Sequence, residues 1–305
     1  MEKQFVVLCP GWIKTGGPEA LHQLAYHLNE TPNVSCAIFY YGKRSAAVIN
    51  EYQQLYPVPR ISQLDLPGAH IVFPESFDPK HVPCPKGGTR WVWWLSANRH
   101  YPINHYEECG HLFQSEYARV KLHTLGVKGL MLTDYLRDLF ASAPDASAER
   151  KSWIAYNAAK SALAAMTLAR TGKFTLVPIK QMTAEQVRKT LSQCKLYIDF
   201  GPHPGRDRLP REAVVNGCMV VTGLEGAAGN KIDVPIPSGY KLSMGQLSQS
   251  SDFFEELLSQ YEQRIVEFRH YAKAVHKQKA TFLKEVDALV SAVETPQFHT
   301  RHTFV

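Results

Sequence analysis

The chain has 305 residues, 45% of them apolar and 20% charged, which is the composition of a folded protein with a buried core rather than of a disordered chain. Its formal net charge of +6 favours anionic ligands, but no long Lys/Arg block occurs, which argues against a protein that coats nucleic acid. Because no run of about 18 apolar residues occurs either, we expect no membrane-spanning segment.

The predicted elements of the first half alternate between strands and helices. In chain order they are a strand at Phe5–Cys9, a helix at 16–30, strands at 34–42, Ala69–Phe73 and Trp91–Leu95, and a strand followed by a helix within 111–127. The first apolar run is too short for a signal peptide. Ser115 is the expected N-cap of the last helix. The first strand, helix and second strand form a βαβ unit, which implies a parallel sheet.

A small, polar, proline-containing segment at 142–151 is the predicted junction between two domains. Beyond it we predict strands at 151–156, 174–179, 196–200 and 218–223, and helices at 161–172, 183–194 and 210–216. Thr183 and Gln186 have the spacing of a capping box, and Pro210 is the expected first residue of its helix. Two successive α/β halves, each with a small doubly wound sheet, are the simplest architecture.

A long helical stretch is predicted at about 251–293. Its apolar face comprises Phe254, Leu257, Leu258, Tyr261, Ile265, Phe268, Ala272 and Val275, and its cations are Arg264, Arg269, Lys273, Lys277 and Lys279. We interpret it as a helix that packs across both domains with a solvated basic face. The alternative is a peripheral contact with anionic lipid at the inner face of the membrane.

The six cysteines show no CxxC spacing, so they support neither a zinc knuckle nor a thioredoxin motif. Cysteines dispersed through apolar runs are typical of a reducing compartment, so we expect a cytoplasmic protein.

Two loops that follow predicted strands carry candidate ligand-binding residues. Gly16 and Gly17 would let backbone amides approach a phosphate or a sugar at the start of a helix. The loop has neither the GxGxxG nor the Walker pattern, and the next strand ends in aromatic residues instead of an acid, which disfavours a nicotinamide site. Lys160 stands at the opening of another helix, where a lysine opposes the helix dipole unless an anion binds. The alternatives are a turn that needs glycine and an ordinary exposed lysine.

A third loop holds Arg206, Arg208 and Arg211. The first two lie just before the predicted helix start, so their guanidinium groups and the helix amides can converge on a site of diphosphate size. Glu212, one turn into the helix, would hold hydroxyl groups such as those of a ribose. The alternative is that these arginines pair with Asp207, Glu212 and Asp233. No DxD sequence occurs, so we expect no metal, and the cations of the protein would neutralise a departing diphosphate.

These segments together resemble the GT-B fold glycosyltransferases, in particular the retaining group involved in bacterial surface (capsular and O-antigen) polysaccharide synthesis. The similarity covers nearly the whole chain. It is strongest over 197–223, which read YIDFGPHPGRDRLPREAVVNGCMVVTG, with support from TGGPEALHQLA, HLFQSEYARVKLHTLGV, LTDYL and AYNAAK.

The resemblance implies that Glu212 binds the ribose of the donor nucleotide, as the second glutamate of a paired-glutamate motif. It also implies that Gly16 and Gly17 lie against the donor phosphate and the acceptor, and that Lys160 binds the diphosphate. The first glutamate of the pair would fall at Pro204 and is missing. The candidate donor-binding residues are therefore Gly16, Gly17, Tyr156, Asn157, Lys160, His203, Arg206, Arg208, Arg211 and Glu212.

We predict an α/β protein with two Rossmann-like domains that face a cleft. The expected domains are 1–145 for the acceptor, 146–275 for the nucleotide-sugar, and a helix and tail at 276–305 that pack back on the first domain. The predicted reaction is cofactor-free and metal-independent transfer of a sugar from a nucleotide-diphosphate sugar to a glycan or lipid-linked glycan, with retention favoured over inversion. The alternatives are a non-catalytic nucleotide-sugar or glycan-binding partner of another transferase and a phage-type DNA glycosyltransferase, although no basic stripe with interleaved aromatic residues indicates nucleic acid.

In this interpretation Arg206 and Arg208 stabilise the leaving group. An inverting enzyme would also need a base, for which Glu75, Asp78 and His100 are candidates, each with an ordinary loop role as the alternative. The tryptophans at 91, 93 and 94 could stack on sugar rings, although strand alternation places Trp93 in the core as readily.

Overall fold

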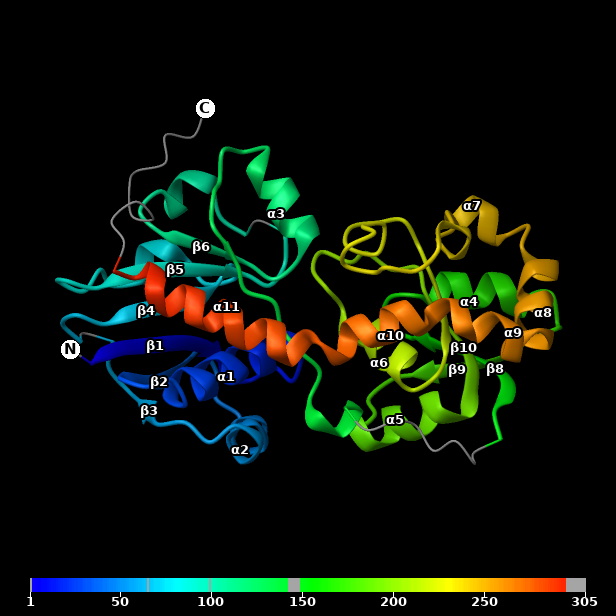
Figure 1. The fold of residues 1–305 in the computed structure, drawn as a ribbon, viewed down its shortest axis with the longest axis horizontal. Helices are drawn as coiled ribbons and strands as arrows, with labels where there is room; N and C mark the ends of the chain where they lie inside the picture. The colour runs from blue at the N-terminus through cyan, green and yellow to red at the C-terminus, as the bar shows by residue number, and fades with distance from the viewer. Residues whose placement is uncertain (1, 65, 99, 142–148, 295–305) are drawn as a thin grey trace. The chain divides into compact units, whose positions relative to one another are not determined.

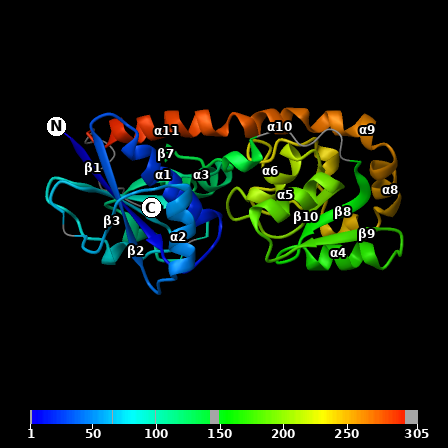
Figure 2. The ribbon, with the colours of Figure 1, turned by 90° about the horizontal axis from the view of Figure 1, so that it is seen from below.

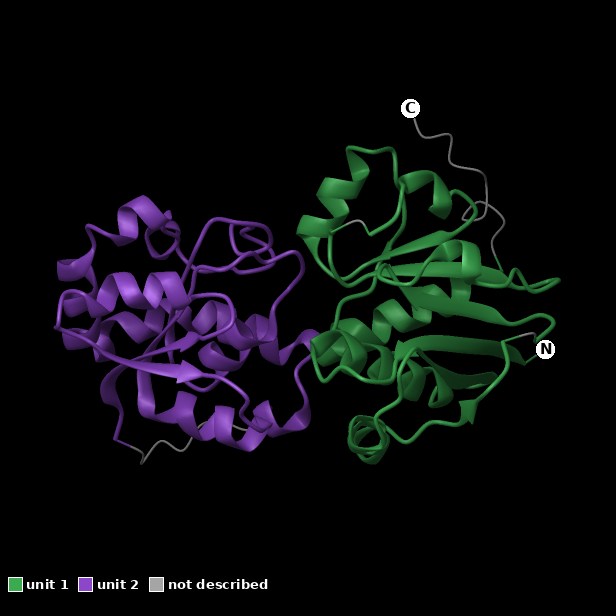
Figure 3. Cartoon of the chain, turned by 180° about the vertical axis from the view of Figure 1, so that it is seen from behind, with its two compact units in different colours: residues 1–134, 279–305 green, residues 135–278 purple. Residues whose placement is uncertain are grey.

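The computed structural model describes residues 2–64, 66–98, 100–141 and 149–294. The chain divides into two compact units, of which unit 1 comprises Met1–Asp134 with Lys279–Val305 and unit 2 comprises Tyr135–Gln278 (Figure 3). Most of the predicted junction, residues 142–148, and the tail 295–305 lie outside the described residues. Among the described residues, no helix combines the length and the apolar character needed to cross a bilayer.

Unit 1 is built on a seven-stranded sheet with the order β3-β2-β1-β4-β5-β6-β7, in which every pair is parallel. The strands are β1 (Lys3–Pro10), β2 (Val34–Tyr41), β3 (Arg60–Ile61), β4 (His70–Pro74), β5 (Thr89–Trp94), β6 (Gly110–Phe113) and β7 (Leu130–Met131). The central strands read as continuous apolar runs because both of their faces are covered. The strand order reverses between β1 and β4, and such a switch point is where open α/β sheets bind their ligands.

The helices of unit 1 are α1 (Gly16–Asn29), α2 (Ala46–Leu55), α3 (Glu116–His123) and most of α11 (Gln278–Ala292), with the short 3₁₀ turns η1 (Pro79–His81) and η2 (Ile103–Tyr106). The helix α11, far away in sequence, returns to this unit (Figure 1). Lys3 Nζ donates to Val290 O at 3.0 Å, and Thr133 donates its backbone N–H and its hydroxyl to Glu285 Oε2, each at 2.7 Å.

Unit 2 contains a four-stranded parallel sheet with the order β11-β10-β8-β9. Its strands are β8 (Lys151–Asn157), β9 (Thr175–Ile179), β10 (Cys194–Asp199) and β11 (Met219–Thr222). Its helices are α4 (Ala162–Ala169), α5 (Ala184–Gln193), α6 (Arg208–Val215), α7 (Met244–Leu247), α8 (Ser251–Ser259), α9 (Tyr261–Arg264) and α10 (Arg269–His276), with 3₁₀ turns η3 (Asp138–Phe140), η4 (Ser238–Tyr240) and η5 (Ile265–Phe268). Figure 2 shows α4 on one face of this sheet and α5 and α6 on the other. The switch point of unit 2 lies between β8 and β10.

The prediction of an α/β fold with two Rossmann-like halves is confirmed. Both predicted caps are present. Ser115 Oγ accepts the N–H of Ala118 at 3.1 Å, and Thr183 and Gln186 form the reciprocal capping box. Two details differ. The helix expected to start at Pro210 begins at Arg208, and the long C-terminal stretch is broken into α8, α9, η5, α10 and α11.

Candidate functional site

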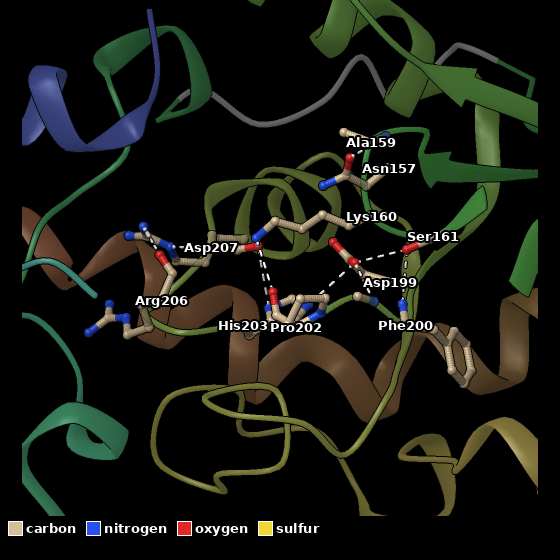
Figure 4. Close-up of polar contacts among 12 residues, drawn as sticks. Asn157, Ala159, Lys160, Ser161, Asp199, Phe200, Pro202, His203, Arg206 and Asp207 are labelled. Atoms are coloured by element: carbon tan, nitrogen blue, oxygen red, sulfur yellow. Dashed lines mark hydrogen bonds and ion pairs between the residues drawn. The ribbon is translucent and has the colours of Figure 1, made fainter. Parts of the chain in front are cut away.

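The loops that follow β8 and β10 meet at the switch point of unit 2 (Figure 4). Gly201 makes this approach possible, because a Cβ at that position would lie 2.3 Å from Lys160 Cβ. Lys160 Nζ donates to Pro202 O at 3.2 Å and to the Asp207 carboxylate. Lys160, 47 positions before Asp207 in the chain, is thereby held against the loop that carries the candidate arginines.

Asp199, the last residue of β10, anchors this meeting point. Its side chain is fully buried, and it accepts hydrogen bonds from Ser161 Oγ at 2.9 Å, Tyr197 OH at 2.8 Å and the Gly201 N–H at 3.3 Å. Burial by itself would raise the pKa of Asp199, but its contacts with His203, Tyr197 and Ser161 outweigh burial and hold the pKa below the ordinary aspartate value. Ser161 Oγ also accepts the Phe200 N–H at 2.9 Å, so one hydroxyl ties the two loops together.

His203 lies between two carboxylates. Its Nε2 is 3.3 Å from Asp199 Oδ1, its Nδ1 is 3.6 Å from Asp207 Oδ2, and only 1% of the residue is exposed. Its carbonyl accepts the Ala227 N–H at 2.8 Å, and Gly226 passes so close that a Cβ there would lie 2.0 Å from the same oxygen. The predicted donor-binding residue His203 is therefore a buried part of the loop framework.

Asp199, His203 and Asp207 each offer an atom that could ligate a metal, and these atoms lie within 4.8 Å of one another. The donor set does not favour a divalent ion, because Asp199 already accepts three hydrogen bonds and Asp207 already holds the Lys160 ammonium. A metal would have to displace that ammonium. The cluster fits an internal network balanced by lysine better than a metal centre.

The three candidate arginines have different surroundings. Arg211 is fully buried, and it donates to Asp207 O at 3.2 Å, to Arg206 O at 3.0 Å and to Gln278 Oε1 at 3.0 Å. Arg211 therefore fixes the backbone of the loop through the carbonyl groups of Arg206 and Asp207. Arg206 and Arg208 are half-buried, and Arg208 is the first residue of α6.

The start of α6 has no side-chain cap. Asp207 is its N-cap residue, but the carboxylate makes no capping hydrogen bond, because it contacts Lys160 instead. Glu212 lies half-buried one turn into the helix. Lys160, held against this loop, thus lies close to two arginines and an uncapped helix start, which is a suitable combination for an anion.

The remaining predicted residues of unit 2 shape the turn after β8. Tyr156 and Asn157 are half-buried at the end of that strand. Asn157 Oδ1 accepts the Ala159 N–H at 3.1 Å, and Asn157 O accepts the N–H groups of Lys160 at 3.2 Å and Ser161 at 2.8 Å. Asn157 therefore folds the loop that presents Lys160.

In unit 1, Gly16 and Gly17 open α1 after the loop that follows β1. Neither has a positive φ, and a Cβ on Gly17 would meet only Leu95 Cδ1, at an ordinary 3.5 Å. Neither the backbone conformation nor the packing therefore requires glycine at 17.

Of the candidate bases, Glu75 is the most unusual. It lies directly after β4 with 5% of its surface exposed, and its Oε2 accepts the Leu95 N–H at 3.1 Å. Burial raises the pKa of Glu75 to about 8. Asp78 accepts the Lys80 N–H at 3.0 Å as the cap of η1, and His100 is exposed.

The tryptophans of β5 do not reach the surface. Trp91, Trp93 and Trp94 are fully buried, and each indole N–H donates within unit 1, to Thr89 Oγ1, Leu132 O and His111 Nδ1. The hypothesis that they stack on sugar rings is wrong, and the alternative of a core position, considered for Trp93, holds for all three.

No family model matches the chain, and no curated protein matches it significantly in sequence. Solved structures do match it along its length. TarM superposes with a TM-score of 0.71 at 8% identity, with 97% of this chain and 99% of that chain covered. The chain has the GT-B fold.

Two further GT-B structures show the same extent of similarity. The lipopolysaccharide outer core galactosyltransferase WaaB gives a TM-score of 0.62 at 9% identity, over 96% of this chain and 99% of that chain. A mutant of S. aureus TarM, in complex with Fondaparinux, alpha-GlcNAc-glycerol and UDP, gives 0.72 at 8% identity, over 97% of this chain and 100% of that chain. At these identities the likeness establishes the fold, so function has to be argued from the chain's own residues.

Sequence reasoning did not identify Ser161 and Asp199 as site residues. The available signal was the end of a buried strand, where Tyr197 and Asp199 are two positions apart and therefore share a face. Ser161, the partner of Asp199, follows β8, so this contact could be predicted only if β8 were known to lie next to β10.

Proposed function

We propose that this protein is a glycosyltransferase that moves a sugar from a nucleotide-diphosphate sugar to an acceptor hydroxyl, with the diphosphate bound at the switch point of unit 2. The observation that carries the proposal is the position of Lys160. Its ammonium contacts the neighbouring loop that holds Arg206 and Arg208, beside the uncapped start of α6. The similar folds of a galactosyltransferase and of a UDP complex support it.

The diphosphate of the donor would replace the Asp207 carboxylate as the partner of Lys160. In the structure the Asp207 carboxylate binds Lys160, and phosphate oxygens offer the same charge-assisted hydrogen bonds. Because Asp207 also lies 3.6 Å from His203 Nδ1, it keeps a second contact when Lys160 turns to the diphosphate. Glu212, one turn into α6, would accept hydrogen bonds from the ribose hydroxyls.

Stabilisation of the leaving group would then be the main catalytic contribution. Negative charge develops on the diphosphate oxygen as the bond to the sugar breaks, and fixed cations and helix amides stabilise that charge without rearranging. Arg211 contributes indirectly, by fixing the carbonyls of Arg206 and Asp207. Because Lys160, Arg206 and Arg208 would supply the positive charge at the diphosphate, we propose that the reaction needs no metal at this point.

Retention of configuration is the finer proposal, since it requires no strong side-chain base. If the reaction inverts, Glu75 is the candidate base that we favour in unit 1, because a carboxyl with a pKa of about 8 is suited to proton transfer near neutral pH. For the acceptor we propose a glycan or lipid-linked glycan of surface polysaccharide synthesis.

The second candidate function is a non-catalytic partner that binds nucleotide-sugar for another transferase. The observation that favours it is Pro204, which stands where the resemblance places the first glutamate of the pair. Turnover by the purified chain alone distinguishes this alternative from the enzyme.

The test is the release of nucleoside diphosphate from UDP-, GDP-, CDP- and dTDP-sugars by the purified chain. Arg206→Ala and Arg208→Ala should each lower kcat/KM by about 10- to 100-fold, the equivalent of about 1.5–3 kcal/mol for a lost charge-assisted hydrogen bond. Arg170→Ala, an exposed arginine that follows α4, is the matched control and should leave kcat/KM unchanged. Unchanged turnover in both single variants and in the double variant would refute the assigned roles.

A further inference from the structure

Three aromatic side chains form a row at the carboxyl edge of the unit 1 sheet. Trp12 follows β1, Tyr41 ends β2 and Phe77 follows β4, and these three strands are neighbours in the order β2-β1-β4. The rings of Trp12 and Tyr41 meet edge to face at 5.8 Å and 82°, and those of Tyr41 and Phe77 at 4.6 Å and 66°. We call these three residues the aromatic row.

The indole of Trp12 is held in place although 42% of the residue is exposed. Gly42 lies against its six-membered ring so closely that a Cβ there would approach within 2.0 Å, and its φ of +72° favours glycine as well. The two loops are also joined by backbone hydrogen bonds, from Gly11 N–H to Tyr41 O at 3.3 Å and from Ser45 N–H to Gly11 O at 2.8 Å. The protein thus covers part of the indole and leaves the rest in solvent.

The location indicates a ligand. The aromatic row lies where the strand order of unit 1 reverses, next to the loop that leads to Gly16 and Gly17. The three tryptophans of β5 are fully buried, so the exposure of Trp12 is not a general property of tryptophan in this unit. Ile13, beside it, is also exposed, at 38%.

The positive charge around the aromatic row is only partly balanced. Lys14 Nζ lies 2.8 Å from Glu51 Oε2, and Arg44 donates to the carbonyl of Tyr40 at 3.2 Å, so Lys43 and Arg44 are the two nearby cations for which the described part of the chain gives no carboxylate partner. An extended polyanion or an anionic membrane would require several available cations. A flat ring with only two such cations nearby instead suits a neutral, hydroxyl-bearing ligand.

We propose that the aromatic row is an acceptor subsite in which a pyranose ring of a carbohydrate stacks on Trp12. The C–H groups on one face of a pyranose are weakly positive and are attracted to the negative face of an aromatic ring, while the hydroxyls at its rim remain in water. Because neighbouring rings of the row stand edge to face, the indole supplies one flat surface, enough for one sugar ring. This subsite rests on the proposed function and assigns to its glycan acceptor a binding residue, Trp12, in unit 1.

The test is saturation-transfer NMR and calorimetry with oligosaccharides built from glucose, N-acetylglucosamine, galactose or mannose. We expect the wild-type chain to bind at least one of them, Trp12→Ala to bind it about three- to tenfold more weakly, and Trp12→Phe to recover most of the affinity. Trp153→Phe, in unit 2, is the matched control and should bind like the wild type. Equal binding by wild type and Trp12→Ala, or no binding of any probe by the wild type, overturns the subsite.

Two further measurements distinguish a sugar ligand from a membrane or a nucleic acid, and separate the subsite from the proposed function. Vesicles of 70% phosphatidylcholine and 30% phosphatidylglycerol and a 12-nucleotide DNA strand are tested with the same variants, and a Trp12-dependent affinity for either, in place of the oligosaccharide, overturns the proposal. Thermal stabilisation by UDP reports on unit 2 and should be equal in wild type and Trp12→Ala. If no nucleotide stabilises the wild type while Trp12-dependent sugar binding persists, the proposed function fails and the sugar subsite stands.

Discussion

The buried carboxyl of Glu75 gives the stability of this protein a specific pH dependence. Glu75 is 5% exposed after β4, and the interactions that compensate its burial are backbone hydrogen bonds, including the 3.1 Å contact from Leu95 N–H. Burial raises the pKa of Glu75 from the ordinary 4.5 to about 8. The folded state therefore keeps a proton that the unfolded chain loses between these two values.

The sign and the size of the pH dependence of stability follow from this difference in pKa. The proton-linked contribution of Glu75 to the free energy of unfolding is fully present below pH 4.5 and is lost as the pH rises through 8. At about 1.36 kcal/mol for each pKa unit, the loss amounts to about 5 kcal/mol. Glu75→Gln keeps the shape of the protonated carboxyl and cannot ionise, so it should lack this loss and become the more stable protein at alkaline pH.

The assay is urea unfolding of wild type and Glu75→Gln at intervals from pH 5 to pH 9. Taking the difference between the two proteins removes the contribution of every other titrating group. The wild type should lose several kcal/mol relative to Glu75→Gln across this range. A difference that stays constant within about 1 kcal/mol would show that Glu75 ionises normally, and it would remove the physical reason for considering this residue as a base.

Three further outcomes follow from the site in unit 2. Ser161→Ala leaves a buried N–H and the Asp199 carboxylate each short of one hydrogen-bond partner, so urea unfolding should show a loss of about 2–3 kcal/mol; a loss under about 0.5 kcal/mol would contradict the network. Arg211→Leu should cost about 3 kcal/mol or more of stability, whereas Arg206→Ala should cost less than about 1 kcal/mol and act on donor binding; equal losses would mean that the two arginines have the same role. Nucleotide affinity should be the same in EDTA and in Mg²⁺, since Lys160, Arg206 and Arg208 supply the positive charge at the diphosphate, and a tenfold preference for Mg²⁺ would count against that role.

Much of the fold could be predicted because strands and caps leave local signals. The run Phe5–Cys9 is apolar at every position because a central parallel strand is covered on both faces, and the Thr183–Gln186 spacing identifies a capping box directly. The sequence predicts the start of α6 two residues late, because proline is favoured at the first helical position. Pro210 instead occupies the third, where its missing N–H also has no intrahelical partner to lose.

The candidate site could be predicted only in part, because it depends on which strands are neighbours. Lys160 and the arginine loop could each be placed at the carboxyl end of a strand from the sequence. Their contact depends on β8 lying next to β10, which no local pattern specifies. The sequence also does not predict which arginine is buried. Arg211 is fully buried, whereas Arg206, five positions earlier, is half-buried.

The central claim is that Lys160 and its loop bind the diphosphate of a nucleotide-sugar. The most direct test is thermal unfolding of the wild type, Lys160→Ala and the control Lys189→Ala with UDP, GDP, CDP and dTDP. One nucleotide should stabilise the wild type and the control, by about 2.7 kcal/mol at one hundred times its Kd, and should stabilise Lys160→Ala much less. Stabilisation by none of the four, or equal stabilisation of Lys160→Ala and wild type, would contradict the claim.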